Sequence, residues 1–268
     1  LDSHTTVDYT PFCLSVYRER FLLMPNSGWT TVRSTLTHFV EVNYVVPAER
    51  VRPHVPPLLE LATVGDGLAF VSAVVVREEG FRPSWLPKIG LSFEHINFRT
   101  YVRFSERFGT FFFHTAMSSP LAPLMRAATG MPTRWTPLRF ERARNQAGLI
   151  VRQAAYSADY GIAVEVQALR YLPDRLDYFS SVQKGLAFLA HPPLGYFARR
   201  GGVYEYAVAH EPIPVRTGRV EVAHWDPLER LGILTSEYES EHPHSVFLGQ
   251  PVEFTIYFPA RRMGDVGH

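Results

Sequence analysis

The sequence is short of lysine. Only Lys88 and Lys184 are lysines among its 27 basic residues, and all the others are arginines. An enzyme that forms an imine with a carbonyl substrate needs a lysine amine that is neutral near pH 7. Arginine does not replace it, because the guanidinium group stays protonated. The composition therefore leaves few positions for Schiff-base chemistry.

Cysteine, excess charge and long apolar runs are also scarce. The single cysteine, Cys13, excludes an intrachain disulfide and is typical of a reducing compartment, so we expect a cytoplasmic protein. A net charge of +1 argues against general attraction to nucleic acid or to an anionic membrane. No apolar run approaches the roughly 18 residues of a membrane span, and residues 1–4 do not resemble a signal peptide. We expect a small-molecule ligand as the partner.

Common cofactor and metal motifs are missing from the sequence. It contains no glycine-rich dinucleotide loop, phosphate-binding loop, zinc-protease motif or hydrolase elbow. Two histidines in Glu241-His242-Pro243-His244 could share one face of a strand as metal ligands. A solvated loop is the preferred interpretation, because spacing assigns no third ligand. We therefore expect neither a cofactor nor a metal.

What the sequence has in abundance is β-forming segments. Short runs rich in Val, Phe, Tyr and Thr are separated by Gly, Pro and Asp, which predicts a mostly antiparallel β protein. With 46 % hydrophobic residues, the chain can bury a substantial core. The predicted strands cover residues 36–46, 68–77, 94–104, 110–117, 148–158, 162–171, 203–210, 219–225 and 252–258.

Few helices are expected. The clearest begins at Ser118 or Ser119, has Pro120 in its first turn and ends at Gly130. Shorter helices are predicted after Pro47 and after Asp226. A hairpin turn is predicted over residues 157–161, where Gly161 can adopt a positive φ.

One predicted strand, residues 94–103, has an unusual alternation. One of its faces is polar and consists of His95, Asn97, Arg99, Tyr101 and Arg103, while Glu94 begins the other. In an open sheet the polar face would meet water, whereas in a barrel it would line the interior. A buried Arg99 would need an anionic partner, either a protein carboxylate or a substrate carboxylate.

Several segments resemble the acetoacetate decarboxylase-like superfamily, and a bacterial branch without an assigned activity that lacks the Schiff-base lysine is the most similar. The most specific is Asn97-Phe98-Arg99-Thr100-Tyr101-Val102. The resemblance implies an α+β fold, mainly antiparallel, with a β-barrel or cone that encloses a pocket and carries a few peripheral helices. It also implies a single domain over residues 1–268, with an N-terminal extension over residues 1–33. The other matching segments are residues 38–44, 56–61, 174–179 and 210–215.

The resemblance implies a pocket in which decarboxylases hold two lysines, a glutamate and an arginine. The lysine motif matches residues 130–134 here, which places Thr133 and Arg134 at the lysine positions. The arginine aligns with Thr37, beside His38. The glutamate aligns with His95, and a register slip of one residue would place Glu94 there on the opposite face.

These matches leave two hypotheses of different class. In the first, the protein is an enzyme without a Schiff base that acts on a carbonyl or carboxylate compound as an isomerase, dehydratase, cyclase or decarboxylase. In the second, the barrel binds a small molecule without catalysis. Self-association is also expected. For the enzyme, the catalytic candidates are His95, His38 and Glu94, and the substrate-binding candidates are Arg99, Thr133, Arg134, Thr37 and Tyr101.

Overall fold

The computed structural model describes residues 30–146, 150–169 and 172–264. Cys13 and residues 1–29 of the predicted N-terminal extension lie outside this part. The first strand begins at Thr30, three residues before the expected end of the extension at residue 33.

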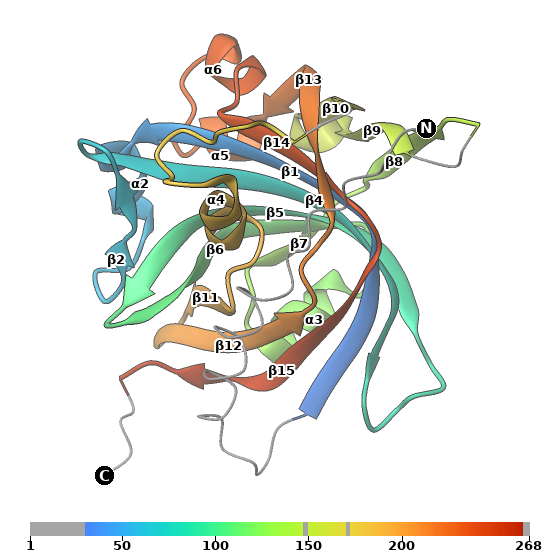
Figure 1. Ribbon diagram of the computed structural model, residues 1–268. Coiled ribbons are helices and arrows are strands. Elements are labelled where there is room, and N and C mark those ends of the chain that lie inside the picture. The colour runs from blue at the N-terminus through green and yellow to red at the C-terminus, as the bar shows by residue number, and fades with distance from the viewer. Residues whose placement is uncertain (1–29, 147–149, 170–171, 265–268) are drawn as a thin grey trace.

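Seven of the described strands close into a mixed β-barrel, which confirms the predicted fold class (Figure 1). Around the barrel the order is β4-β5-β6-β11-β12-β15-β1, and β1 pairs again with β4. All of these pairs are antiparallel except β6 with β11. The strands are β1 (Thr30–Pro47), β4 (Leu68–Pro83), β5 (Leu91–Phe104), β6 (Arg107–Met117), β11 (Leu194–Arg199), β12 (Gly202–His210) and β15 (Val252–Arg262).

Further strands branch from β1 outside the barrel. The second half of β1 pairs with β14 (Ser245–Gly249), and the sheet continues through β13, β10, β9 and β8. An apolar core including Val42, Phe98 and Trp225 joins these strands to the outer face of the barrel. The remaining strands are β2 (Glu60–Leu61), β3 (Thr63–Val64), β7 (Thr133–Trp135), β8 (Arg139–Arg144), β9 (Ile150–Ser157), β10 (Ile162–Ala168) and β13 (Val215–Trp225).

Five short α-helices accompany the strands in the described residues, and none of them is long and apolar enough to cross a membrane. Helix α4 matters most for the interior, because Leu186 and Leu189 pack against Phe70 and Tyr101 on the inner face of the barrel. Figure 1 shows it in front of β5 and β6. The helices are α2 (Ala48–Val51), α3 (Ala122–Thr129), α4 (Val182–Leu189), α5 (Asp226–Glu229) and α6 (Glu237–Glu241).

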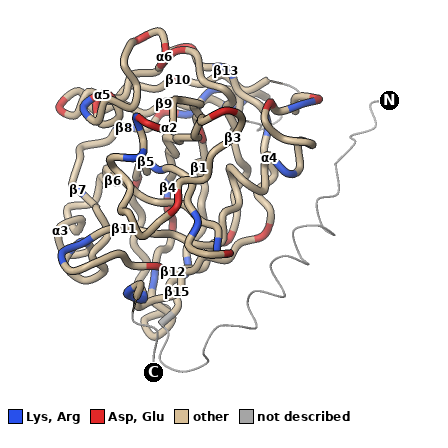
Figure 2. Tube along the Cα trace, turned by 90° about the vertical axis from the view of Figure 1, so that its left-hand side faces the viewer, with Lys and Arg blue, Asp and Glu red and all other residues tan. Residues whose placement is uncertain are grey.

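Charged residues of both signs are interspersed along the described chain (Figure 2). This distribution agrees with the near-zero net charge of the sequence. Basic and acidic side chains also occur on β1, β4 and β5, so some of them must be accommodated inside the barrel.

Several element boundaries differ from the sequence-based predictions. Strand β4 continues to Pro83, six residues beyond the expected end, because a register irregularity between Glu78 and Phe81 keeps its charged end paired with β5. Helix α3 begins at Ala122 rather than at Ser118 or Ser119. It ends at Gly130 in the left-handed conformation, as predicted, and Gly161 also has a positive φ.

Short elements were missed. Strands β8, β11 and β14 are five or six residues long, and β7 has only three. Helix α4 was missed because Gly185 interrupts its pattern. A Cβ at Gly185 would lie 2.7 Å from Leu176 Cδ1, so close packing favours glycine there.

The parallel pair β6 and β11 closes the barrel at a point of very close backbone approach. A Cβ at Gly109 would overlap the Leu194 carbonyl oxygen, which is backbone and cannot move aside. We therefore expect Gly109→Ala to lower the free energy of unfolding by about 2 kcal/mol, measured by urea denaturation. An unchanged unfolding midpoint would contradict the described contact between β6 and β11.

Candidate functional site

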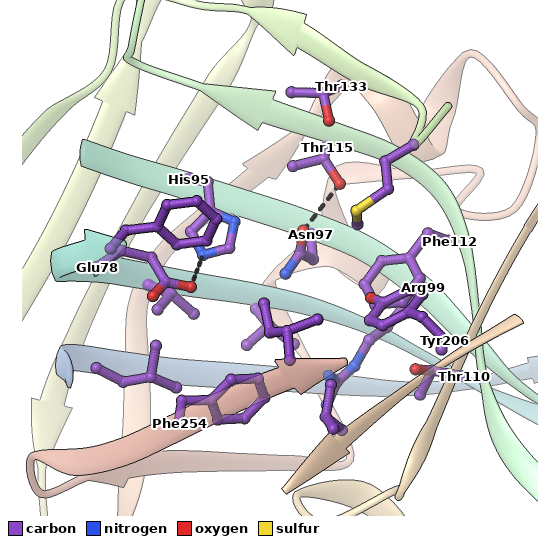
Figure 3. Close-up of a pocket in the computed structure, with 18 of the residues that line it drawn as sticks. Glu78, His95, Asn97, Arg99, Thr110, Phe112, Thr115, Thr133, Tyr206 and Phe254 are labelled. Atoms are coloured by element: carbon purple, nitrogen blue, oxygen red, sulfur yellow. Dashed lines mark hydrogen bonds and ion pairs between the residues drawn. The ribbon is translucent and has the colours of Figure 1, made fainter. Parts of the chain in front are cut away.

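The barrel encloses a largely apolar cavity of about 120 Å³, several times the space that one water molecule needs. It lies between β4, β5 and β6 on one side and β12 and β15 on the other (Figure 3). Its apolar walls include Leu36, Val74, Phe112, Met117, Tyr206 and Phe254. Polar side chains interrupt these walls, among them His95, Asn97 and Arg99 from β5.

At one end of the cavity, His95 faces a buried carboxylate. His95 Nε2 lies 3.4 Å from Glu78 Oε1, and both side chains line the cavity (Figure 3). The Ser34 hydroxyl donates a hydrogen bond to the other Glu78 oxygen. Because a carboxylate only accepts hydrogen bonds, Glu78 favours the tautomer with its proton on Nε2. The lone pair then lies on Nδ1, away from Glu78.

Asn97 comes next along β5. The Thr115 hydroxyl donates to Asn97 Oδ1 at 2.9 Å, so the amide oxygen is occupied (Figure 3). The Asn97 amide nitrogen is turned toward the cavity as a hydrogen-bond donor. Thr133, which pairs with Thr115 across β6 and β7, lines the same wall.

Arg99 follows in the same direction and is held by an internal carboxylate. Its Nη2 donates to Glu41 Oε1 and to the Leu189 carbonyl oxygen, both at 3.0 Å. The Tyr101 hydroxyl donates to the same two acceptors. Complete burial raises the pKa of Glu41, and the Arg99 guanidinium opposes that shift. The sequence left open whether Arg99 pairs with a protein or a substrate carboxylate, and Glu41 is the partner in the structure.

Two further histidines lie near Arg99. His210 lines the cavity, stacks on Phe254 and has its ring centre 5.4 Å from that of His191. Burial, together with the Arg99 charge, lowers the pKa of His210 to about 4. Burial, His210 and Arg99 lower the pKa of His191 to about 3. Both imidazoles are therefore neutral at pH 7.

Of the predicted site residues, the structure brings three to the cavity wall: His95, Arg99 and Thr133. Tyr101 is also inside the barrel, but its hydroxyl is enclosed with Glu41 and Ser72, away from the cavity. The alternation along β5 therefore places the polar face in the barrel interior, which is one of the two arrangements that the sequence allowed.

The other predicted site residues lie outside the cavity. His38 points to the outer face of the barrel and packs on Phe140, because the backbone between Leu36 and His38 is irregular. Thr37 donates instead to Glu79 on the outer surface. The expected convergence of His38 and Thr37 with His95 does not occur.

Glu94 and Arg134 are also directed away from the cavity. Glu94 pairs with Arg77 and accepts from the Ser118 hydroxyl at 2.7 Å, on the face of β5 opposite to His95. Arg134 is exposed and lies over the Tyr160 ring at 4.9 Å. Because side chains alternate along β5, His95 faces the cavity and Glu94 faces the other side of the strand.

Sequence reasoning missed Glu78, Thr115 and His210 as cavity residues. Glu78 was missed because β4 was predicted to end at Arg77. The alternation Val74, Val76, Glu78 on one face could have identified it. His210 ends the predicted strand 203–210 and begins the matching segment 210–215, but no role was assigned to it.

Neither lysine contributes to the cavity. Lys88 and Lys184 are both exposed, one in the β4–β5 connection and the other on α4. The histidines at 242 and 244 each have a protein partner at Nδ1, which is the Tyr238 carbonyl for His242 and the Ser245 hydroxyl for His244.

One cluster among the described residues has ligands of the kind that hold metals: His224, Asp226 and Glu229. His224 contacts Asp226 through Nε2 at 3.0 Å and Glu229 through Nδ1 at 3.3 Å. Each ring nitrogen of His224 therefore faces a different carboxylate.

The buried pair of Arg99 and Glu41 predicts an asymmetric response to mutation. Arg99→Met leaves the Glu41 carboxyl without its counter-ion, so we expect the free energy of unfolding to fall by about 3–5 kcal/mol. The double variant Arg99→Met/Glu41→Met should recover most of this loss, measured by urea denaturation. A double variant as unstable as the sum of the single variants would show that the two side chains do not depend on each other.

The buried histidines predict acid sensitivity. Burial and nearby arginines lower the pKa of His38 to about 3, against 6.5 for a free histidine. The unfolded chain then binds more protons, so this contribution to stability is present above pH 6.5 and is lost as pH falls toward 3. The wild type should lose unfolding free energy when the pH is lowered from 7.5 to 5.0. In His38→Gln this loss should be smaller by about 2 kcal/mol. The exposed His242→Gln serves as control, and equal pH profiles for all three proteins would refute the assignment.

Comparisons with known proteins agree with this fold. Residues 33–253 match the family model DUF2071, described as an uncharacterized conserved protein. No curated protein matches significantly. An acetoacetate decarboxylase-like enzyme from Sphingomonas wittichii RW1 is similar in structure, with a TM-score of 0.59, 12% identity, and coverage of 89% of this chain and 94% of that chain.

Two other solved structures are also similar. Acetoacetate decarboxylase from Legionella pneumophila has a TM-score of 0.56 at 12% identity, covering 90% of this chain and 88% of that chain. The enduracididine biosynthesis enzyme MppR, complexed with pyruvate, has a TM-score of 0.53 at 15% identity, covering 91% of this chain and 93% of that chain. The chain thus belongs to the DUF2071 family and has the acetoacetate decarboxylase-like fold that its sequence resemblance implied.

Proposed function

We propose that the protein is an enzyme that binds a small carbonyl compound in the barrel cavity and transfers a proton through His95 without forming an imine. The observation that carries this proposal is the position of His95, which faces an apolar cavity with Glu78 behind it. A histidine oriented by a carboxylate is a common general base, because the carboxylate stabilises the imidazolium that forms.

The proton transfer balances within the cavity. His95 Nδ1 takes a proton from the carbon next to the carbonyl group, and the electron pair of that C–H bond moves toward the carbonyl oxygen. The Asn97 amide and Arg99 Nε are donors that could stabilise the resulting enolate. Return of the proton to the same or another carbon gives exchange or isomerisation. Loss of a β-hydroxyl group from the enolate, with transfer of the His95 proton to that oxygen as the C–O bond breaks, would give water and an unsaturated carbonyl compound.

The solved relatives support a carbonyl ligand by analogy. One similar structure is of MppR complexed with pyruvate, and another is of an acetoacetate decarboxylase. The shared fold allows a small carbonyl compound to be enclosed, but a fold does not determine a reaction. The exposed positions of Lys88 and Lys184 favour noncovalent binding in this protein.

A second candidate is a binding protein without catalysis. The observation that favours it is the largely apolar wall of the cavity, which would hold an apolar or aromatic molecule with no chemical step. In that case His95 and Glu78 would be a structural pair. Proton exchange distinguishes the two candidates.

Exchange of α-protons into deuterated water, followed by proton NMR, tests the enzyme directly. A panel of neutral ketones and of α- and β-keto acids is incubated with the wild type. We expect at least one compound to exchange, and His95→Gln to slow that exchange by about 100-fold or more. The variants Lys88→Ala and Lys184→Ala should exchange at the wild-type rate.

His38→Gln is the matched control, because it removes another buried histidine that lies outside the cavity. Exchange that persists in His95→Gln would refute the role of His95. A lysine adduct after borohydride reduction would refute the noncovalent mechanism. Tight binding of a panel member without any exchange would establish the binding protein instead.

A further inference from the structure

The charges around the cavity are already balanced by the protein itself. Arg99 is the only arginine or lysine among the described residues that line the cavity, and its guanidinium lies 3.0 Å from the Glu41 carboxylate. Glu78, at the other end, adds a carboxylate beside His95. A protonated His95 would balance Glu78, and a neutral His95 would leave a negative charge. Neither state leaves a positive charge to attract an anion.

The other histidines near Arg99 do not change this balance. Burial keeps the pKa of His210 near 4 and that of His191 near 3. Both are neutral at pH 7, so they add no positive charge to the end of the cavity where Arg99 lies.

Two polar groups at the Arg99 end of the cavity are hydrogen-bond donors that a ligand can use. Thr115 occupies the Asn97 amide oxygen and leaves the amide nitrogen facing the cavity. Arg99 Nε is buried and has no hydrogen-bond partner among the residues that the structure describes. Both nitrogens only donate, so the complementary ligand atom is an acceptor. An ammonium group would not satisfy either of them, and both Glu78 oxygens already face protein partners, Ser34 and His95.

Aromatic rings line the space around these donors. Phe93, Phe112, Tyr206 and Phe254 all contribute to the wall. Such walls favour an aryl or branched apolar body over a small, strongly hydrated one.

We propose that the ligand is an electrically neutral carbonyl compound with an apolar body, and that Glu41 is the specificity residue that excludes carboxylates. This inference rests on the proposed function and deepens it by naming the substrate class. A carboxylate would lose its hydration on entry and would find the Arg99 charge already compensated. A neutral carbonyl oxygen has a smaller hydration cost and fits the donors on Asn97 and Arg99.

Four ligands of nearly equal shape test the inference on the wild-type protein by calorimetry at pH 7.5. They are 4-phenylbutan-2-one, 3-phenylpropanamide, the anion 3-phenylpropanoate and the cation 3-phenylpropylammonium. We expect the ketone and the amide to bind about tenfold or more tightly than either ion. Equal or tighter binding of the carboxylate or the ammonium ion would overturn the inference, and so would failure of all four to bind.

The variant Glu41→Gln tests the role of Glu41. It removes the carboxylate that compensates Arg99, so we expect the ratio of the affinity for 3-phenylpropanoate to that for the ketone to rise about tenfold, measured on protein whose cooperative urea denaturation shows that it is folded. Glu253→Gln is the matched control, because it removes one exposed carboxylate on β15, next to the cavity residue Phe254. An equal ratio in the wild type and in Glu41→Gln would refute the assignment.

Failure of this inference is distinguishable from failure of the proposed function. The ligand series measures binding alone and needs no turnover. If carboxylates bind best while His95-dependent proton exchange persists, the substrate class is wrong and the enzyme proposal stands. If neutral carbonyl compounds bind best but none exchanges protons, the substrate class stands and catalysis does not.

Discussion

The buried ion pair between Arg99 and Glu41 is the interaction on which the interior of this barrel depends. It joins β5 to β1, and the Leu189 carbonyl oxygen at the end of α4 accepts from the same guanidinium nitrogen. The Tyr101 hydroxyl completes the set by donating to Glu41 and Leu189. An isolated charge at this depth would be very costly, so each ionic group requires the other. The pair separates the apolar core beneath α4 from the cavity beyond it.

The cavity takes its character from the way in which this pair is satisfied. Because Glu41 already compensates Arg99, a strand rich in polar residues can line an interior without creating a strong anion site. The remaining polar groups on β5, Asn97 and His95, are spaced two residues apart and therefore face the same side. Hydrogen bonding by Thr115 and the contact with Glu78 orient them. The result is a mostly apolar cavity with two polar side chains, His95 and Asn97, held in place on one wall.

The solved proteins of similar fold include an acetoacetate decarboxylase and MppR, and the fold alone does not assign a reaction to this chain. A Schiff-base enzyme needs a desolvated amine, whereas both lysines of this protein are exposed. The cavity wall has Thr115 and Thr133 instead. His95 and Glu78 instead form a polar pair at one end. A barrel whose strands determine the shape of the cavity can exchange these side chains without losing its architecture, which is why fold and reaction vary independently.

The sequence by itself determined the fold class, the two faces of β5 and the shortage of lysine. These follow from composition and from the alternation of side chains, which are local properties. It did not determine that β4 extends to Glu78, that His38 faces outward, or that Glu41 is the partner of Arg99. Glu41 and Arg99 are 58 residues apart in sequence, and the irregularity of β1 near His38 arises from its pairing with β4. Contacts between distant strands depend on register and barrel closure, so only the tertiary structure decided them.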